Sequence, residues 1–167
     1  MSMSRTGFWT AFRSLGHTLA ALTTNCPDFE RAWNSAEQAE SSGSALAGRW
    51  EGEWVSEANG HRGALRCVLS ERGEGRYEAR FHARYAKVLR VCYAIELGGT
   101  PSANGVRLKG HADLGRLAGG IYEYEGEVTA NRLVCTYRCR YDHGTFRLAR
   151  RVAVPQHPAH ARAVHEH

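Results

Sequence analysis

The fold is decided by one stretch, Gly48-Arg49-Trp50-Glu51-Gly52-Glu53-Trp54-Val55-Ser56. Its two tryptophans fall on one parity, and the charged residues around them fall on the other. A period of two places alternate residues on opposite faces of a strand. The stretch therefore predicts a half-buried antiparallel strand over 48–56, with both tryptophans inside and the charges in water.

The same alternation recurs seven more times downstream. The inward-facing residues of these segments begin in turn at Leu65, Tyr77, Leu89, Val106, Tyr122, Leu133 and Phe146. Mostly short turn segments separate them, so each strand is expected to pair with the next. Closing such a meander leaves no unpaired edge. The sequence therefore predicts an all-β fold, an eight-stranded antiparallel up-and-down barrel with an N-terminal helical segment.

Turn chemistry places the connections. Asn59-Gly60 predicts a tight hairpin in which both residues have positive φ. The segment 98–105, rich in Gly, Ser, Pro and Asn, is the clearest loop, and a tight turn is expected near 86–88. The last hairpin is placed at 142–144, and Tyr141 is expected to face the interior on the strand before it.

Helical periodicity is confined to the start of the chain. Apolar residues from Phe8 to Leu22 recur at steps of three and four, and a second stripe follows Pro27 with Phe29 and Trp33. Pro27 suits the first position of a helix. We expect a helical extension and linker over 1–44, a barrel domain over 45–154 and a flexible histidine-rich tail over 155–167. The helices are interpreted as a cap packed on the barrel, with a membrane-surface or partner-docking role as the alternative.

The composition is that of one soluble globular domain with modest extensions. The 167 residues are 43% hydrophobic and 23% charged, with a net charge of +5. No segment reaches the roughly 18 consecutive apolar residues of a membrane span. A cytoplasmic location is favoured, and export is the alternative. The sequence does not fix the oligomeric state.

The five cysteines are Cys26, Cys67, Cys92, Cys135 and Cys139, an odd number without a CxxC spacing. Inward parity places Cys67, Cys135 and Cys139 in the core, whereas Cys92 faces outward. We expect no intrachain disulfide and five free thiols, as in a reducing compartment.

Gly48-Arg49-Trp50, following a helical segment, resembles the Gly-x-Trp signature of lipocalins and their calycin relatives. The resemblance implies that Trp50 plugs one end of the barrel and that a basic residue late in the chain packs across its indole. Arg150 matches that residue by position, with Arg147 as the alternative. Gly48 and Trp50 are then structural residues. The chain also resembles a group of uncharacterised bacterial proteins, which implies no activity.

The expected interior is rich in tyrosine. All seven tyrosines of the chain fall on the inward parity. Two interpretations stand: tyrosines that only pack the core, or apolar cavity walls that carry a few hydroxyl groups, which is how small-ligand sites are built. Inward Gly52, Gly110 and Gly126 are expected to leave gaps. The candidate ligand-binding residues are Trp54, Tyr77, Tyr93, Tyr122, Tyr124, Tyr137 and Arg150.

The favoured function is binding of a small, mostly apolar ligand in the barrel interior, with or without an acidic group. Inward-facing cations support the acidic group, although Arg150 stacked on Trp50 and Lys87 at the barrel rim are the simpler assignments. The first alternative is a structural or interaction protein with a filled barrel. A small-molecule enzyme is the second. We find no catalytic motif and assign no catalytic residue, cofactor or metal site, and the tail histidines are interpreted as adventitious chelators.

Arginines on the outward parity, including Arg66, Arg80 and Arg84, form a stripe that suggests a polyanion such as RNA. Single-strand binders interleave aromatic side chains with basic ones, because bases stack on them. Here the aromatic residues face the opposite way, and glutamates share the outer face. We therefore expect no specific nucleic-acid partner, and we expect the outer face, including His82, to be solvated.

Overall fold

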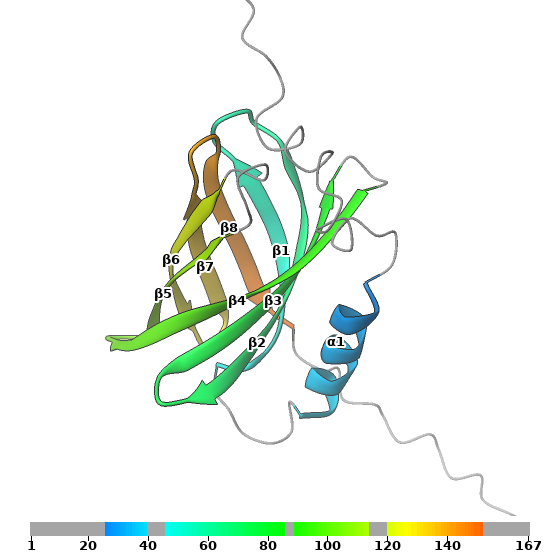
Figure 1. Cartoon of the computed structure of the whole chain (residues 1–167). Helices are drawn as coiled ribbons and strands as arrows, with labels where there is room; N and C mark the ends of the chain where they lie inside the picture. Colours follow the sequence, from blue (N-terminus) through cyan, green and yellow to red (C-terminus); the bar gives the residue numbers. More distant parts are fainter. Residues whose placement is uncertain (1–25, 40–45, 86–88, 114–119, 152–167) are drawn as a thin grey trace, which may run out of the picture.

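The computed structural model describes residues 26–39, 46–85, 89–113 and 120–151. Eight antiparallel strands close into a barrel in which each strand pairs with its neighbours in sequence and β8 returns to β1 (Figure 1). One helix precedes them in the described chain. The elements are α1 (Pro27–Ala39), β1 (Gly48–Ser56), β2 (Arg62–Gly73), β3 (Arg76–Tyr85), β4 (Leu89–Ser102), β5 (Gly105–Asp113), β6 (Ile121–Thr129), β7 (Arg132–Arg138) and β8 (His143–Arg150). The predicted fold class is confirmed.

Strand β1 closes the barrel. On one side Trp50 lies opposite Cys67 of β2, and on the other it lies opposite Arg150 of β8. The β1–β8 register continues to Ser56 opposite Gly144. The alternation of the opening stretch thus sets the parity of both neighbouring strands, since a shift of one residue would turn every side chain to the other face.

Every strand contributes side chains of the predicted inward parity to the core. Trp50 is fully buried and Trp54 is 6% exposed. The core around them contains Leu65, Cys67, Leu69, Tyr77, Ala79, Phe81, Ile95, Leu97, Leu108, Tyr122, Tyr124, Val128, Leu133, Cys135, Tyr137, Phe146 and Leu148. The period-two pattern therefore identified the buried face of each strand.

The Gly-x-Trp segment occupies the position that the resemblance implied. The guanidinium carbon of Arg150 lies 5.5 Å from the centre of the Trp50 ring, and its Nη2 donates to the carbonyl of Ala47 at 2.8 Å. Gly48 has a φ of 141°, a conformation that favours glycine. The expected stacking of Arg150 on Trp50 is confirmed.

Helix α1 lies against the outer face of β1, β2 and β3 (Figure 1). Pro27 is its first residue, as predicted, and the buried side of the helix carries Phe29 and Trp33. These two side chains form a second apolar cluster with Cys26 and Val68, outside the barrel wall. The expected helix over 8–22 and the tail lie outside the described residues.

Two connections differ from the prediction. Gly60 alone of the Asn59-Gly60 pair has positive φ, and the loop spans 57–61 because Ser56 N–H donates to the carbonyl of His61. The segment 98–105 is mostly strand, since β4 continues to Ser102 and pairs with β5. Pro101 is tolerated there because β3 begins at Arg76, opposite Gly98, and does not run alongside Pro101. A proline in a strand needs such an unpaired edge. The turn expected at 86–88 lies outside the described residues.

Among the described residues, no helix is both long enough and apolar enough to cross a membrane.

Replacing the fully buried indole tests the closure of the barrel. We expect Trp50→Ala to lower the free energy of unfolding by about 3–5 kcal/mol, because the truncation leaves a cavity at the β1–β8 junction. Urea denaturation followed by circular dichroism measures the loss. Tyr141→Ala is the control, since Tyr141 is 52% exposed and should change stability little. A Trp50→Ala protein as stable as the parent would contradict the burial of this residue.

Candidate functional site

An aromatic cluster fills the part of the barrel bounded by β6, β7 and β8. The ring of Phe146 lies 5.0 Å from that of Tyr137 and 6.4 Å from that of Tyr124, and Tyr122 stacks on Tyr124 at 6.3 Å. Phe81 of β3 extends the cluster, 5.3 Å from Phe146. Strand alternation brings these rings together, because each side chain points inward and the residues lie opposite or diagonal to one another on paired strands.

The phenols of this cluster stay protonated at neutral pH. Burial raises the pKa of Tyr122, Tyr124 and Tyr137 well above the usual range, and the charge of Asp142 adds to the shift of Tyr137. The Tyr137 hydroxyl donates to Asp142 Oδ2 at 3.3 Å, and Ser56 Oγ donates to Oδ1 at 2.6 Å. As neutral groups, these phenols act as hydrogen-bond donors and acceptors rather than as bases.

Tyr93 joins the cluster from β4. Its ring lies 5.2 Å from that of Phe81, and burial raises the pKa of its hydroxyl. Tyr93 as a whole residue keeps some exposed surface, whereas its hydroxyl is enclosed by the cluster. Tyr93 therefore links the aromatic cluster to the outer surface of β4.

The remaining predicted ligand-binding residues lie apart from this cluster. Tyr77 is four residues along β3 from Phe81 and packs where Gly99 leaves room, since a Cβ at Gly99 would lie 2.4 Å from its ring. Trp54 stacks on Tyr85 at 6.0 Å and donates from Nε1 to the carbonyl of Arg84 at 3.1 Å. The structure therefore divides the predicted set into several locations.

The buried end near Trp50 has one polar atom without a partner. Trp50 Nε1 is buried and has no acceptor among the described residues. Arg150 covers the ring face rather than the nitrogen. A buried donor of this kind costs free energy unless an acceptor reaches it.

Two expectations about the interior are wrong. Tyr141 is exposed, because β7 ends at Arg138 and the Cys139 N–H donates to the carbonyl of Asp142, which closes a turn. The inward glycines do not leave gaps: a Cβ at Gly110 would lie 2.5 Å from the carbonyl oxygen of Glu96, and one at Gly126 would lie 2.4 Å from that of Val134. These glycines let neighbouring strands approach closely.

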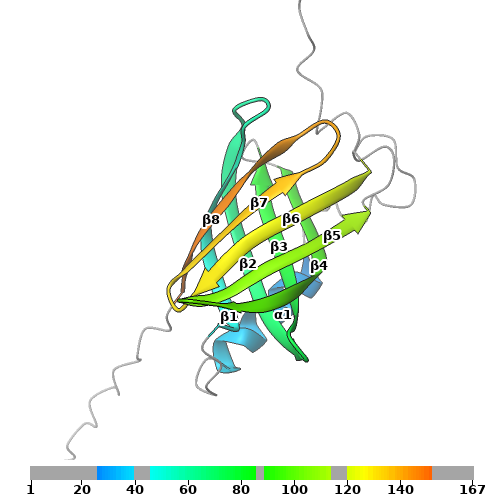
Figure 2. The same ribbon diagram turned by 90° about the vertical axis from the view of Figure 1, so that its left-hand side faces the viewer.

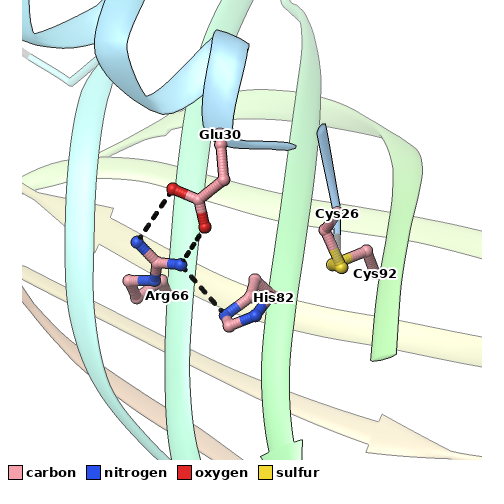
Figure 3. A network of polar contacts seen from close by, with 5 residues as sticks. All are labelled: Cys26, Glu30, Arg66, His82 and Cys92. Carbon is pink, nitrogen blue, oxygen red and sulfur yellow. Dashed lines mark hydrogen bonds and ion pairs between the residues drawn. A yellow bond between two sulfur atoms is a disulfide. The ribbon is translucent and has the colours of Figure 1, made fainter. Parts of the chain in front are cut away.

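Outside the barrel, α1 covers a polar network that the sequence did not reveal (Figure 3). Glu30 of α1 pairs with Arg66 of β2 at 2.5 Å, and Arg66 Nη2 lies 3.3 Å from His82 Nδ1 on β3. The guanidinium also lies 5.0 Å from the centres of the Phe29 and Trp33 rings. The helix thus supplies both an anion and two aromatic faces to Arg66.

His82 is neutral in this network. It is 4% exposed and stacks on Phe29 at 5.3 Å. Burial, and then the charge of Arg66, lower its pKa from 6.5 to about 4. A guanidinium only donates hydrogen bonds, so His82 Nδ1 accepts and the proton sits on Nε2.

A disulfide between Cys26 and Cys92 joins the start of α1 to β4, beside His82 (Figure 3). The expectation of five free thiols is therefore wrong, although Cys67, Cys135 and Cys139 are free. Cys92 does face outward, as predicted, but the docked helix brings Cys26 to it. The apolar stripe of α1 was the available signal, because it requires a surface to cover.

The part of the outer face of β1, β2 and β3 that α1 covers is not solvated as expected, whereas Arg76 and Arg84 on the same face are exposed. Arg49 is 2% exposed, pairs with Glu37 at 2.9 Å and lies 5.4 Å from the Trp33 ring centre. Arg66 and His82 are covered in the same way. Strand parity placed these residues outside the barrel correctly, but it gave no information about the helix above them.

On the opposite wall, formed by β5 to β8 and facing the viewer in Figure 2, lies an open hollow of about 950 Å³. Lys109 and Arg138 line it together with Glu57, Glu123 and Glu125. Lys109 pairs with Glu125 at 3.0 Å. Charges of both signs are interleaved on this face, which offers no continuous basic track for a polyanion. The absence of a specific nucleic-acid partner stays a prediction.

The fold and interior define a closed, eight-stranded antiparallel β-barrel consistent with a lipocalin-like barrel. Comparisons with protein-family models, with curated proteins and with solved structures found no match.

The buried histidine predicts a pH dependence of stability. The pKa of His82 is 6.5 in the unfolded chain and about 4 in the folded protein. Between these pH values the unfolded chain therefore binds one more proton than the folded protein. We expect stability to fall as pH is lowered through this window, by roughly 3 kcal/mol in total. Urea denaturation of the oxidised protein at several pH values measures it.

Matched variants isolate the contribution of His82. His82→Asn removes the titrating group but keeps an acceptor for Arg66, and should flatten the pH dependence. His111→Asn changes an exposed histidine and should leave the dependence intact. Equal slopes for the parent and His82→Asn would show that another group is responsible.

Proposed function

We propose that the barrel binds a small, mostly apolar ligand in its interior, and that the ligand enters between β4 and β5. One observation carries the proposal: among the described residues, β4 and β5 pair only between Gly98–Ser102 and Gly105–Lys109, while the earlier half of β4 pairs with β3. In Figure 1, β4 crosses the barrel obliquely and diverges from β5. We call the unpaired stretch between 89–95 and 111–113 the β4–β5 seam, and Gly110, packed against Glu96, lies at its edge.

The seam leads to the aromatic cluster. Tyr93 of β4 and Ala112 of β5 point inward along it, and both are only partly buried. Tyr93 contacts Phe81 in the centre of the barrel. A ligand that enters beside Tyr93 would therefore reach Phe81 and the tyrosines of β6 and β7 without breaking a strand pair among the described residues.

The cluster favours a neutral ligand with an acceptor group. Rings supply apolar contact area, and protonated phenols supply donors that orient a carbonyl or hydroxyl. Tyr93, Tyr122 and Tyr124 are the residues we assign to this role. Tyr137, whose hydroxyl already donates to Asp142, adds its ring to the wall. Trp54 and Tyr77 would extend the wall on either side. We assign Arg150 to the Trp50 end, where its contacts already match a structural role.

A structural or interaction protein with a filled barrel is the second candidate. The close strand approach at Gly110 and Gly126 favours it, because those positions add no interior volume. The two candidates differ in whether a ring-sized molecule enters the core. Neither requires catalysis.

The disulfide bears on location. Structural disulfides form and persist in oxidising compartments and are rare in the cytosol. We therefore favour export over the cytoplasmic location that the cysteine count suggested.

A carbonyl-bearing fluorescent probe, 2-acetyl-6-(dimethylamino)naphthalene, tests ligand binding. We expect saturable binding with blue-shifted emission. Tyr93→Phe should weaken it about 3–10-fold, the loss of one hydrogen bond, while keeping the ring. Tyr141→Phe is the control and should bind as the parent does. Native mass spectrometry of the freshly purified protein should show a co-purifying small molecule.

No saturable binding by a correctly folded parent, together with an empty native spectrum, would favour the filled barrel. Binding that responds equally to Tyr93→Phe and Tyr141→Phe would place the probe outside the barrel.

A further inference from the structure

Three residues of metal-binding types meet outside the barrel, under the start of α1. The ligand atoms of Cys26, His82 and Cys92 all lie within 4.8 Å of one another. They come from the residue before α1, from β3 and from β4 (Figure 3). This cluster is separate from the interior site, so an inference about it does not depend on what the barrel binds.

We propose that reduction of the Cys26–Cys92 disulfide converts this cluster into a zinc site. Two thiolates and an imidazole are a ligand set that Zn²⁺ prefers. Three protein ligands leave a fourth tetrahedral position for water. In the oxidised protein the sulfur atoms are bonded to each other, and the site cannot form.

A dithiol can serve as the reductant for this conversion. The dithiol gives two electrons and two protons to the protein disulfide, which becomes two thiols, and it leaves as its own disulfide. Zn²⁺ then displaces the two thiol protons and binds the thiolates. The neutral imidazole of His82 binds through one ring nitrogen and keeps its proton on the other, which ends the hydrogen bond from Arg66 to Nδ1. Because two negative ligands offset the charge of the ion, the cluster gains no net charge under the helix.

The backbone holds two of the three ligands at suitable positions. His82 and Cys92 are directly opposite each other in the β3–β4 ladder. Tetrahedral zinc, with sulfur at about 2.3 Å and nitrogen at about 2.0–2.1 Å, needs ligand atoms about 3.4–3.8 Å apart. The ligand atoms all lie within 4.8 Å of one another, and once the disulfide is reduced the two sulfur atoms can separate to the distance that zinc needs by rotation of their side chains.

Docking of α1 delivers the third ligand. Cys26 lies directly before Pro27, and the carbonyl of Cys26 accepts from the Glu30 N–H at 3.0 Å. Phe29 and Trp33 keep the helix on the barrel without the disulfide bond. A metal bridging Cys26 to β3 and β4 would therefore hold α1 in the same place as the disulfide does.

An ion can reach the cluster from solvent. Cys92 is partly exposed, and His82 lines a groove of about 520 Å³ together with Glu30 and Arg66. Glu30 holds the Arg66 guanidinium at 2.5 Å and offsets its charge beside the site. The groove thus supplies a path for the ion and a neutralised neighbour.

Cobalt(II) binding to the full chain tests the proposal, because Co²⁺ on thiolates gives a charge-transfer absorption that histidines alone do not. The oxidised parent should titrate with three free thiols and show no such band. After reduction by a dithiol and removal of the reductant, we expect one equivalent of Co²⁺ to bind with the band present and Zn²⁺ to displace it. Zn²⁺ should also raise the Tm of the reduced protein and not that of the oxidised one.

Single substitutions assign the ligands. Cys92→Ser and His82→Ala should each weaken Co²⁺ binding by more than about 100-fold, beyond what changes around a ligand cost. Cys139→Ser and His111→Ala are the matched controls and should bind as the parent does. All variants keep the histidine-rich tail, so its binding cancels in the comparison.

Three results would overturn the proposal. The first is a folded, reduced parent without the charge-transfer band. The second is a band that survives both Cys92→Ser and His82→Ala, which would assign the metal to other thiols. The third is loss of the barrel's circular dichroism on reduction, since the site requires β3 and β4 to stay paired.

Discussion

Pairing of β1 with β8 is the constraint on which the rest of the structure depends. It turns a meander into a closed barrel, and it places Trp50 beside Arg150 at one end of the interior. Because the register of β1 is shared with β2 and β8, the parity of a single strand decides which side chains enter the core. The aromatic cluster, and any ligand that it holds, exist only inside a closed wall.

A second apolar layer outside the wall creates the conditions for polar chemistry. Phe29 and Trp33 cover Arg66 and Arg49, which then need partners because a buried charge is costly. Glutamates of α1 supply them. The same cover brings Cys26 to Cys92 and keeps His82 from solvent. Packing of α1 on the barrel wall therefore brings all the residues of the external cluster together.

Period-two alternation predicted the strands and the closure from the sequence, because burial on one face requires apolar residues at alternate positions. The Trp50–Arg150 contact was implied by the Gly-x-Trp resemblance instead. The sequences of the strands show no comparable pattern that would reveal a helix covering their outer face. For that reason the sequence correctly predicted that Cys92 and His82 face outward, but it did not predict that α1 lies over them. Tyr141 was misplaced because Asp142, hydrogen-bonded to Ser56 and Tyr137, ends β7 early, a contact between residues far apart in the chain.

Native-state hydrogen exchange across the β1–β8 pair tests the central claim most directly. If the barrel is closed, the paired amides of both strands exchange only on global unfolding and match the protection of β2 and β3. Their apparent free energies should coincide within error. Rapid exchange along β1 and β8, with slow exchange retained in β2 to β4, would show an open sheet with two edges and would contradict the account.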